Sequence, residues 1–238
     1  MSATPFAVRA IDDRQVWDDF LGRVNPQTFL QAWAWGEFNR REGHAVWRWH
    51  LVTPGGGAPV AALQAIEIRA RRGVFIFCPH GPVVADPTDH AALAAAVDCL
   101  VEQGMNSQAD FVRVSSLQPE TDAEREWFRR RGFRPAPIHM HPELAGLRDV
   151  TPDEGTLLSG MRKTMRQSIR KSRHLGITVR HGTAASDAAM FLDLYRHTAQ
   201  RQHFVAFSER YVRDELSAFG ADAQVFLAEH AGKVLAGA

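Results

Sequence analysis

The pattern of polar and apolar positions is most informative between Glu154 and Arg180. Apolar residues recur there at helical spacing and form one seam, which predicts an amphipathic helix. Gly176 stands where such a helix would end, and Ile177–Arg180 is typical of a strand. A second stripe of cations lies about one residue further round the helix, and no Asp or Glu occurs from Met161 to Arg180. The seam is Leu158, Met161, Met165 and Ile169, and the stripe is Arg162, Arg166, Arg170 and Arg173 with Lys163 and Lys171.

The rest of the chain alternates between strand and helix patterns. Turn residues separate these patterns, as in the Pro-Gly-Gly-Gly-Ala-Pro segment between two strands. Asp12 or Asp13, Ser186 and Ser208 are expected to cap helices. The predicted strands are Phe6–Ile11, Ala45–Val52, Val60–Arg69, Val74–Phe77, Phe111–Ser115 and Gln224–Glu229. The predicted helices include a short one around Trp35 and Phe38 that ends at Gly43, and those at Asp89–Gln103 and Thr121–Arg131.

This alternation predicts an α/β or α+β fold with mostly antiparallel sheets and helices on their faces. The breaker-rich segment Pro135–Pro142 marks a plausible boundary, so we expect domains at residues 1–145 and 146–238. The last predicted hairpin has barely begun its second strand at Val234. We therefore expect the second domain to be incomplete within these residues, and the fragment to be inactive or poorly active alone.

Composition and charge narrow the class of protein. The 238 residues are 45% hydrophobic and 23% charged, which is ordinary for a globular protein. The net charge of +1 conceals local basic clusters, so any anion site is local. Cys78 and Cys99 lie in apolar surroundings without metal-ligand spacing, which indicates buried thiols and a reduced compartment. No segment has the pattern of a signal peptide or an integral membrane span, and we expect a cytoplasmic protein.

The cationic stripe has two interpretations. Arginines in a row without neutralising carboxylates suit a polyanion, and phosphates are the obvious partners. Most charge runs, however, are only solvated helix faces. Spacing alone leaves both interpretations open.

Six segments occur in an order that resembles a known family. Together they resemble the FemABX family of peptidoglycan bridge-forming aminoacyltransferases, and the resemblance covers nearly the whole chain. The Lys-Thr-x-Arg-x-x-Ile-Arg-Lys helix, followed by Gly-Ile and a strand, is the strongest of them. The segments are FLQAWAWGEF, FCPHGPVV, RRGF, KTMRQSIRKSRHLGI, FLDLYRHTAQRQHF and VFLAEHAGKVLAG.

The resemblance implies tandem GNAT-like acyltransferase domains, the second of which is entered through the basic helix and truncated here. It implies transfer of an amino acid from aminoacyl-tRNA to the stem-peptide amine of a peptidoglycan precursor, either a UDP-muropeptide or lipid II. It implies neither a cofactor nor a metal. A lipid-linked precursor would bring the protein into peripheral contact with the inner membrane face.

Several residues match positions of the family's motifs. Arg166 matches an arginine that holds precursor phosphate, and Thr164 matches a polar position that contacts the same ligand. Asn39 stands where members often carry a lysine for the diphosphate. Since Asn is not a cation, Arg40 or Arg41 could take over that contact. The expected precursor-binding residues are Arg166, Thr164, Lys163, Arg170, Asn39 and Arg40.

Two further positions depart from the family's pattern. His80 stands in a Pro-x-Gly-Pro turn where arginine is frequent, and Ser115 stands where several members have an aspartate. No general base is identified, because His80, His197 and His203 are candidates by residue type alone. Aminolysis of an activated ester needs alignment, proton removal and oxyanion stabilisation, so no nucleophilic triad is required.

Two other functions stay open. The first is a GNAT-type N-acyltransferase that uses acyl-CoA or another acyl donor. The letters of its pyrophosphate loop occur at residues 40–45, but after a helix and before a strand, which is the wrong context. The second is a non-enzymatic nucleic-acid-binding module, against which the near-neutral total charge counts.

Overall fold

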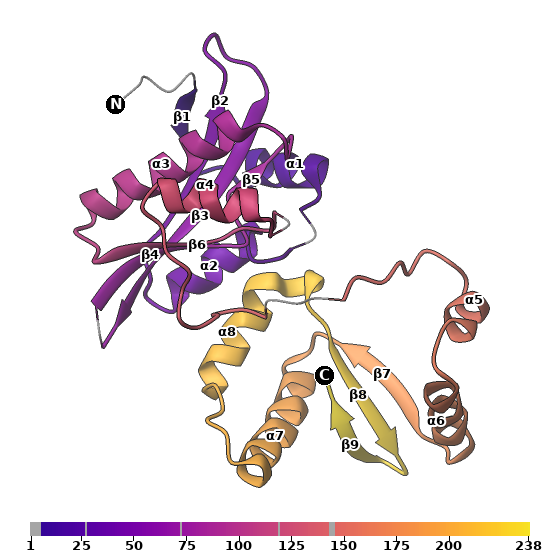
Figure 1. Ribbon diagram of the computed structural model, residues 1–238. Helices are drawn as coiled ribbons and strands as arrows, with labels where there is room; N and C mark the ends of the chain where they lie inside the picture. The colour runs from indigo at the N-terminus through magenta and orange to yellow at the C-terminus, as the bar shows by residue number, and fades with distance from the viewer. Residues whose placement is uncertain (1–5, 27, 72, 119, 143–145) are drawn as a thin grey trace. The chain divides into compact units, whose positions relative to one another are not determined.

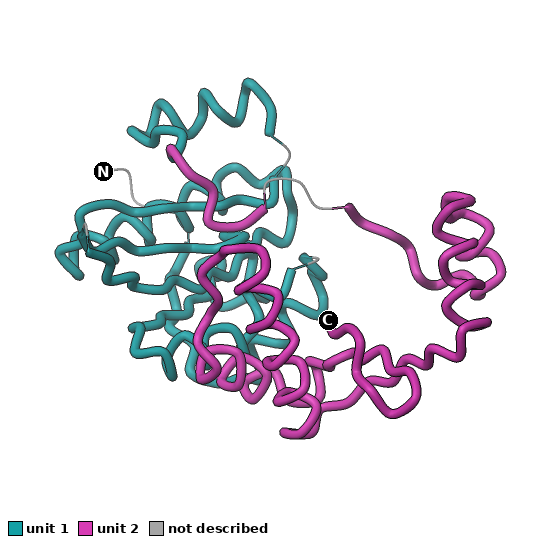
Figure 2. The backbone as a smooth tube through the Cα atoms, turned by 90° about the horizontal axis from the view of Figure 1, so that it is seen from below, with its two compact units in different colours: residues 1–136 teal, residues 137–238 magenta. Residues whose placement is uncertain are grey.

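The computed structural model describes residues 6–26, 28–71, 73–118, 120–142 and 146–238. The chain divides into two compact units, residues 1–136 and 137–238 (Figure 2). The domain boundary expected after residue 145 stays a prediction. Each unit is described by itself below.

A mixed β-sheet forms the centre of unit 1 (Figure 1). Its strand order is β1-β2-β3-β4-β6, with the short β5 paired to β3. Strands β4 and β6 run parallel, and the other described pairs are antiparallel, as the sequence predicts. The strands are β1 (Ala7–Ala10), β2 (Val46–Val52), β3 (Pro59–Ala70), β4 (Gly73–Pro79), β5 (Val83–Val84) and β6 (Phe111–Ser115).

Helices cover both faces of this sheet because β3 is apolar on both. Alternate residues Ala61, Leu63 and Ala65 pack with α3, while Ala62 packs with Trp17 and Phe20 of α1. Helix α4 adds aromatic residues to the α3 face. The helices are α1 (Arg14–Val24), α2 (Trp33–Arg41), α3 (His90–Asn106) and α4 (Asp122–Arg130).

Unit 2 is a smaller α/β arrangement. Three antiparallel strands in the order β7-β8-β9 pack against α7, where Leu192 and Leu227 are fully buried. Helices α5 and α6 precede the sheet (Figure 1). The elements are α5 (Glu154–Ser159), α6 (Lys163–His174), β7 (Thr178–Gly182), α7 (Ala185–Gln202), α8 (Glu209–Phe219), the 3-10 turn Gly220–Asp222, β8 (Val225–His230) and β9 (Lys233–Gly237).

Most of the predicted helix starts agree with the structure, and one does not. Asp13 and Ser208 accept hydrogen bonds from the first-turn N–H groups of α1 and α8, as expected of caps. The cap expected at Ser186 is wrong, because α7 begins at Ala185. Asp187 supplies the polar group there instead, and its Oδ2 accepts the Ala184 N–H at 3.3 Å.

The prediction of one continuous helix from Glu154 to the glycine is also wrong. Asp153 caps the short α5, which ends at Gly160, and Arg162 is extended at φ −56° and ψ 145°. A new helix then starts at Lys163. Glycine disfavours helix relative to alanine by about 1 kcal/mol, which helps to place the break here. The apolar seam therefore does not run along one helix, and Met165 is 55% exposed.

The cysteines agree with the sequence prediction, because Cys78 is buried and Cys99 is partly buried, both as free thiols. Burial raises the pKa of the Cys99 thiol to about 12. Among the helices that the structure describes, none is long and apolar enough to cross a membrane.

Candidate functional site

Helix α6 carries the cations that the sequence singled out. Its twelve residues include no Asp or Glu, and none of them is buried. Because 3.6 residues make a turn, Arg162, Arg166 and Arg170 lie along one side of the helix. Lys163 and Thr164 begin the helix and are exposed. The structure thus brings together Lys163, Thr164, Arg166 and Arg170 within unit 2.

Arg166 is held in place by the bend between α5 and α6. Its Nη1 donates to the carbonyl oxygen of Met161 at 2.5 Å and to that of Ser159 at 3.0 Å. Among the described residues, Nε and Nη2 of Arg166 make no hydrogen bond. The guanidinium is therefore anchored by one nitrogen and presents the other two.

The other end of α6 is terminated as predicted. Gly176 has φ +73°, a conformation that glycine adopts without steric cost. The N–H of Ile177 donates to the Ser172 carbonyl oxygen at 3.0 Å, which closes the last turn before β7. The basic helix is thus fixed between two defined ends.

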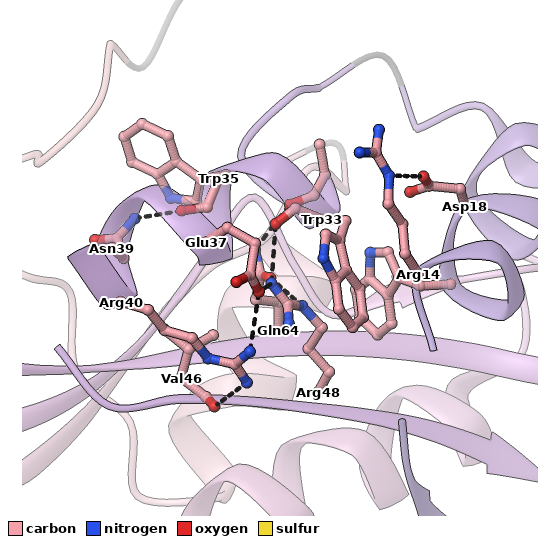
Figure 3. A network of polar contacts seen from close by, with 12 residues as sticks. Arg14, Asp18, Trp33, Trp35, Glu37, Asn39, Arg40, Val46, Arg48 and Gln64 are labelled. Carbon is pink, nitrogen blue, oxygen red and sulfur yellow. Dashed lines mark hydrogen bonds and ion pairs between the residues drawn. The ribbon is translucent and has the colours of Figure 1, made fainter. Parts of the chain in front are cut away.

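Asn39 and Arg40, the candidates of unit 1, already have protein partners (Figure 3). Asn39 is buried, and its side-chain amide donates to the Trp35 carbonyl oxygen at 2.8 Å. Arg40 donates to Glu37 Oε1 at 2.9 Å and to the Val46 carbonyl oxygen at 3.2 Å. The α2 candidates therefore offer less unused hydrogen-bonding capacity than Arg166 does.

Beneath α2 lies a buried cation that the sequence analysis did not name. The side chain of Arg48 is fully buried, and it donates to Glu37 Oε1 at 3.0 Å and to Gln64 Oε1 at 2.7 Å (Figure 3). Its guanidinium lies 3.7 Å from the ring centre of Trp33. Burial, followed by the nearby charge of Arg40, lowers the pKa of Arg48 to about 10, so it stays charged at neutral pH. A signal was present, because Arg48, His50 and Gln64 interrupt otherwise apolar strands.

The Pro-x-Gly-Pro turn follows β4 at the edge where β6 also ends. His80 has φ +49°, and its Nδ1 lies 2.9 Å from Thr28 Oγ1. Burial lowers the pKa of His80. Ser115 is aligned with Pro79 in the parallel pair β4–β6, so it lies beside this turn. His80 and Ser115 therefore belong to one corner of unit 1.

The remaining candidates by residue type lie elsewhere. His197 is on α7, where its Nδ1 is 2.8 Å from the Asp193 carbonyl oxygen, and His203 caps the end of that helix. Trp47 and Trp49 share one face of β2, as predicted, with ring centres 6.5 Å apart and packing against the core. Residues 40–45 join α2 to β2, which is the wrong context for a pyrophosphate loop. In the part of the chain that the structure describes, no cluster of three or more His, Cys, Asp or Glu residues is placed to hold a metal.

Unit 2 also resembles a known protein family in sequence. Residues 138–232, which include α6 and nearly all of unit 2, match the sequence model of the FemAB family. Over these residues the chain is similar to the FemAB family. The resemblance to the FemABX group is thereby confirmed, while no curated protein matches the chain.

Solved structures extend the likeness to both units. The crystal structure of FemX matches with a TM-score of 0.77 and 20% identity over 93% of this chain. The chain spans 57% of the length of that FemX chain. The predicted α/β fold class, with mixed and mostly antiparallel sheets, is confirmed.

Two acetyltransferase structures also match, and the match covers 99% of each acetyltransferase chain. The Trypanosoma brucei acetyltransferase is 14% identical over 58% of this chain, with a TM-score of 0.44. Glucosamine-6-phosphate N-acetyltransferase from Arabidopsis thaliana is 13% identical over 59% of this chain, with a TM-score of 0.43.

Proposed function

We propose that this chain takes part in the transfer of an amino acid from aminoacyl-tRNA to the stem-peptide amine of a peptidoglycan precursor. The precursor is a UDP-muropeptide or lipid II. The observation that carries the proposal is the exposed cationic side of α6, which has no carboxylate and lies within the FemAB segment. A diphosphate supplies the negative charges that neutralise the cations on this side of α6.

Arg166 is the central ligand in this proposal. Because Nη1 is tied to the α5–α6 bend, the guanidinium loses little freedom when the precursor binds. Its remaining nitrogens, Nε and Nη2, form one edge of the planar fork and suit two phosphate oxygens. Arg170 follows one turn later and extends the same cationic side. Lys163 and Thr164 add an ammonium group and a hydroxyl at the start of the helix.

Asn39 and Arg40 are proposed as secondary contacts from unit 1. Asn39 contributes no charge, and its amide is bonded to the Trp35 carbonyl oxygen. Arg40 would exchange its bond to Val46 or Glu37 for one to the precursor. We therefore assign less of the phosphate affinity to these two residues than to Arg166.

Aminolysis of an aminoacyl ester needs no covalent intermediate with the protein. An aminoacyl ester is already activated, so the protein aligns the amine with the ester, assists removal of the proton and stabilises the oxyanion. The catalytic base is not assigned. The donor partner is aminoacyl-tRNA, no cofactor or metal takes part, and the reaction takes place in the cytoplasm. A lipid-linked precursor would bring the protein to the inner membrane face.

Lysine footprinting tests the proposal, since the chain has only three lysines. Lys163 and Lys171 lie on α6, while Lys233 starts β9 and serves as the internal control. A UDP-muropeptide should slow modification of Lys163 by a water-soluble acylating reagent and leave Lys233 unaffected. Protection by acetyl-CoA alone would favour an acyl-CoA enzyme. Equal, steeply salt-dependent protection by any RNA would favour a nucleic-acid module.

A further inference from the structure

A hollow in unit 2 lies outside the cationic helix. It forms where α7 ends and the loop to α8 begins. Its volume is about 410 Å³, and it is a shallow hollow that is widely open to solvent. Its lining is Arg196, Ala199, Gln200, His203, Phe204 and Ala206, and includes no carboxylate.

Arg196 faces this hollow with unused hydrogen-bonding capacity. Its nearest carboxylate oxygens, on Asp193 and Glu209, are 3.8 and 3.7 Å away, which is too far for a hydrogen bond. Glu209 instead accepts two bonds from Arg213, at 2.9 and 2.7 Å. The two carboxylates therefore orient the Arg196 guanidinium without occupying its donors.

The other two polar residues that line the hollow, Gln200 and His203, also have unused side-chain hydrogen-bonding groups. Within the described ranges, neither Gln200 nor His203 has a side-chain hydrogen bond to a protein group. His203 adopts the left-handed conformation, with φ 57° and ψ 40°, and its N–H donates to the Ala199 carbonyl oxygen. Only a few per cent of non-glycine residues adopt positive φ. The helix end thus turns sharply and brings His203 and Phe204 onto one wall.

Phe204 supplies an aromatic surface beside Arg196. Phe204 is 43% exposed, and its ring centre lies 5.8 Å from that of Tyr195. The loop is tied back where the Phe207 N–H donates to the Tyr195 hydroxyl oxygen at 3.2 Å. Phe207 is nevertheless 60% exposed. The loop therefore presents apolar surface instead of burying it.

These groups match the parts of a nucleotide. An arginine fork suits a phosphate, an open phenyl ring stacks on a base, and a side-chain amide pairs with a base edge. We propose that this hollow binds a nucleoside monophosphate unit, with its phosphate at Arg196 and its base on Phe204. The proposal rests on the proposed function, in which that unit is the terminal nucleotide of the donor RNA.

Binding of adenosine 5′-monophosphate to the 238-residue protein tests the site. Amide NMR shifts should locate saturable binding at residues 196–206, and adenosine or inorganic phosphate alone should bind more weakly. Arg196→Ala should weaken binding by about tenfold or more, since a charged hydrogen bond is lost. Phe204→Ala should weaken it by about fivefold or more through lost stacking. Both side chains are at least 43% exposed, so both variants should fold.

Arg210→Ala is the matched control, because Arg210 lies on α8, pairs with Asp214 and does not line the hollow. Loss of binding in this variant equal to that in Arg196→Ala would overturn the proposal, as would the absence of saturable binding. Phosphate that binds as tightly as the nucleotide would also overturn it, because the aromatic wall would then contribute nothing.

The two proposals can fail separately. Arg166→Ala should leave nucleotide binding unchanged while it weakens precursor binding. Nucleotide binding at the hollow without any precursor binding would reject the proposed function and retain the hollow. Precursor protection of Lys163 with no nucleotide binding would reject the hollow alone.

Discussion

The Arg166 guanidinium is fixed to the Met161 carbonyl oxygen at 2.5 Å across the bend that separates α5 from α6. The same nitrogen reaches the Ser159 carbonyl oxygen, so this arginine joins two helices. A side chain held in this way is both a structural tie and a preorganised cation. The two roles predict different effects of substitution.

Arg166→Ala should weaken binding of a UDP-muropeptide by about 1.5–3 kcal/mol, the usual contribution of hydrogen bonds to charged groups. Thermal unfolding should change little, because the bend is exposed. Titration calorimetry on the variant and on Arg166→Lys measures the effect, and the lysine variant should keep part of the affinity through its charge. An unchanged affinity in the alanine variant would mean that the cationic side of α6 is only a solvated surface and not a phosphate site.

Glu37→Ala should destabilise unit 1 by about 3 kcal/mol, because it leaves the buried Arg48 charge without its carboxylate partner. Asp18→Ala is the control, since its partner Arg14 is exposed and such pairs contribute about 0–1 kcal/mol. Urea unfolding of both variants gives the comparison. Equal effects would mean that Arg48 finds solvent or other acceptors when Glu37 is absent.

Gly36→Ala should be strongly destabilising, because a Cβ at this position would collide with Arg48 Nη2 and Gln64 Oε1. Gly22→Ala on α1 has open space around the new methyl group and should stabilise by about 0.5–1 kcal/mol. Both glycines lie in helices, so helix propensity is matched and only the close approach differs. Thermal melts of the pair separate packing from propensity. A Gly36→Ala variant as stable as Gly22→Ala would contradict the tight contact.

His50 should make the protein sensitive to acid. It is 1% exposed and stacks on Trp17, and burial, followed by the charge of Arg23, lowers its pKa from 6.5 to about 4. The unfolded chain therefore binds a proton first as the pH falls. Stability should be full above pH 6.5 and should fall progressively between pH 6.5 and 4. Linkage gives a loss of about 2 kcal/mol between pH 7.5 and 5 from this group.

Urea unfolding at pH 7.5 and 5 measures that loss, with His50→Leu as the comparison. The variant removes the titrating group, so its own loss should be smaller by about 2 kcal/mol if other titrations are unchanged. The same loss in both proteins would assign the acid sensitivity to other groups.

Sequence patterns predicted most of the fold because the strands are apolar and turn residues bound them. Strand β6 was predicted at its observed limits, Phe111–Ser115. The interruption at Gly160 was missed, because Leu158, Met161 and Met165 keep helical spacing across it. Spacing records which side a residue would occupy in a helix, and does not record whether the backbone continues.

The candidate site was predicted in part. The cations of α6 follow directly from the sequence, since they are consecutive turns of one helix. The bond of Arg40 to the Val46 carbonyl oxygen does not, because it joins α2 to β2 and forms only when these elements pack together. The bonds of Arg166 to Met161 and Ser159 also depend on a bend that periodicity did not reveal. Polar networks of this kind depend on tertiary contacts that spacing does not encode.

Calorimetric titration of the protein with a UDP-muropeptide, with acetyl-CoA titrated in parallel, tests the central claim most directly. The account predicts saturable binding of the muropeptide, weakened by added salt, and no binding of acetyl-CoA. Binding of acetyl-CoA without binding of the muropeptide would contradict it. The fold would then be that of an acyl-CoA enzyme, and the cations of α6 would need another ligand.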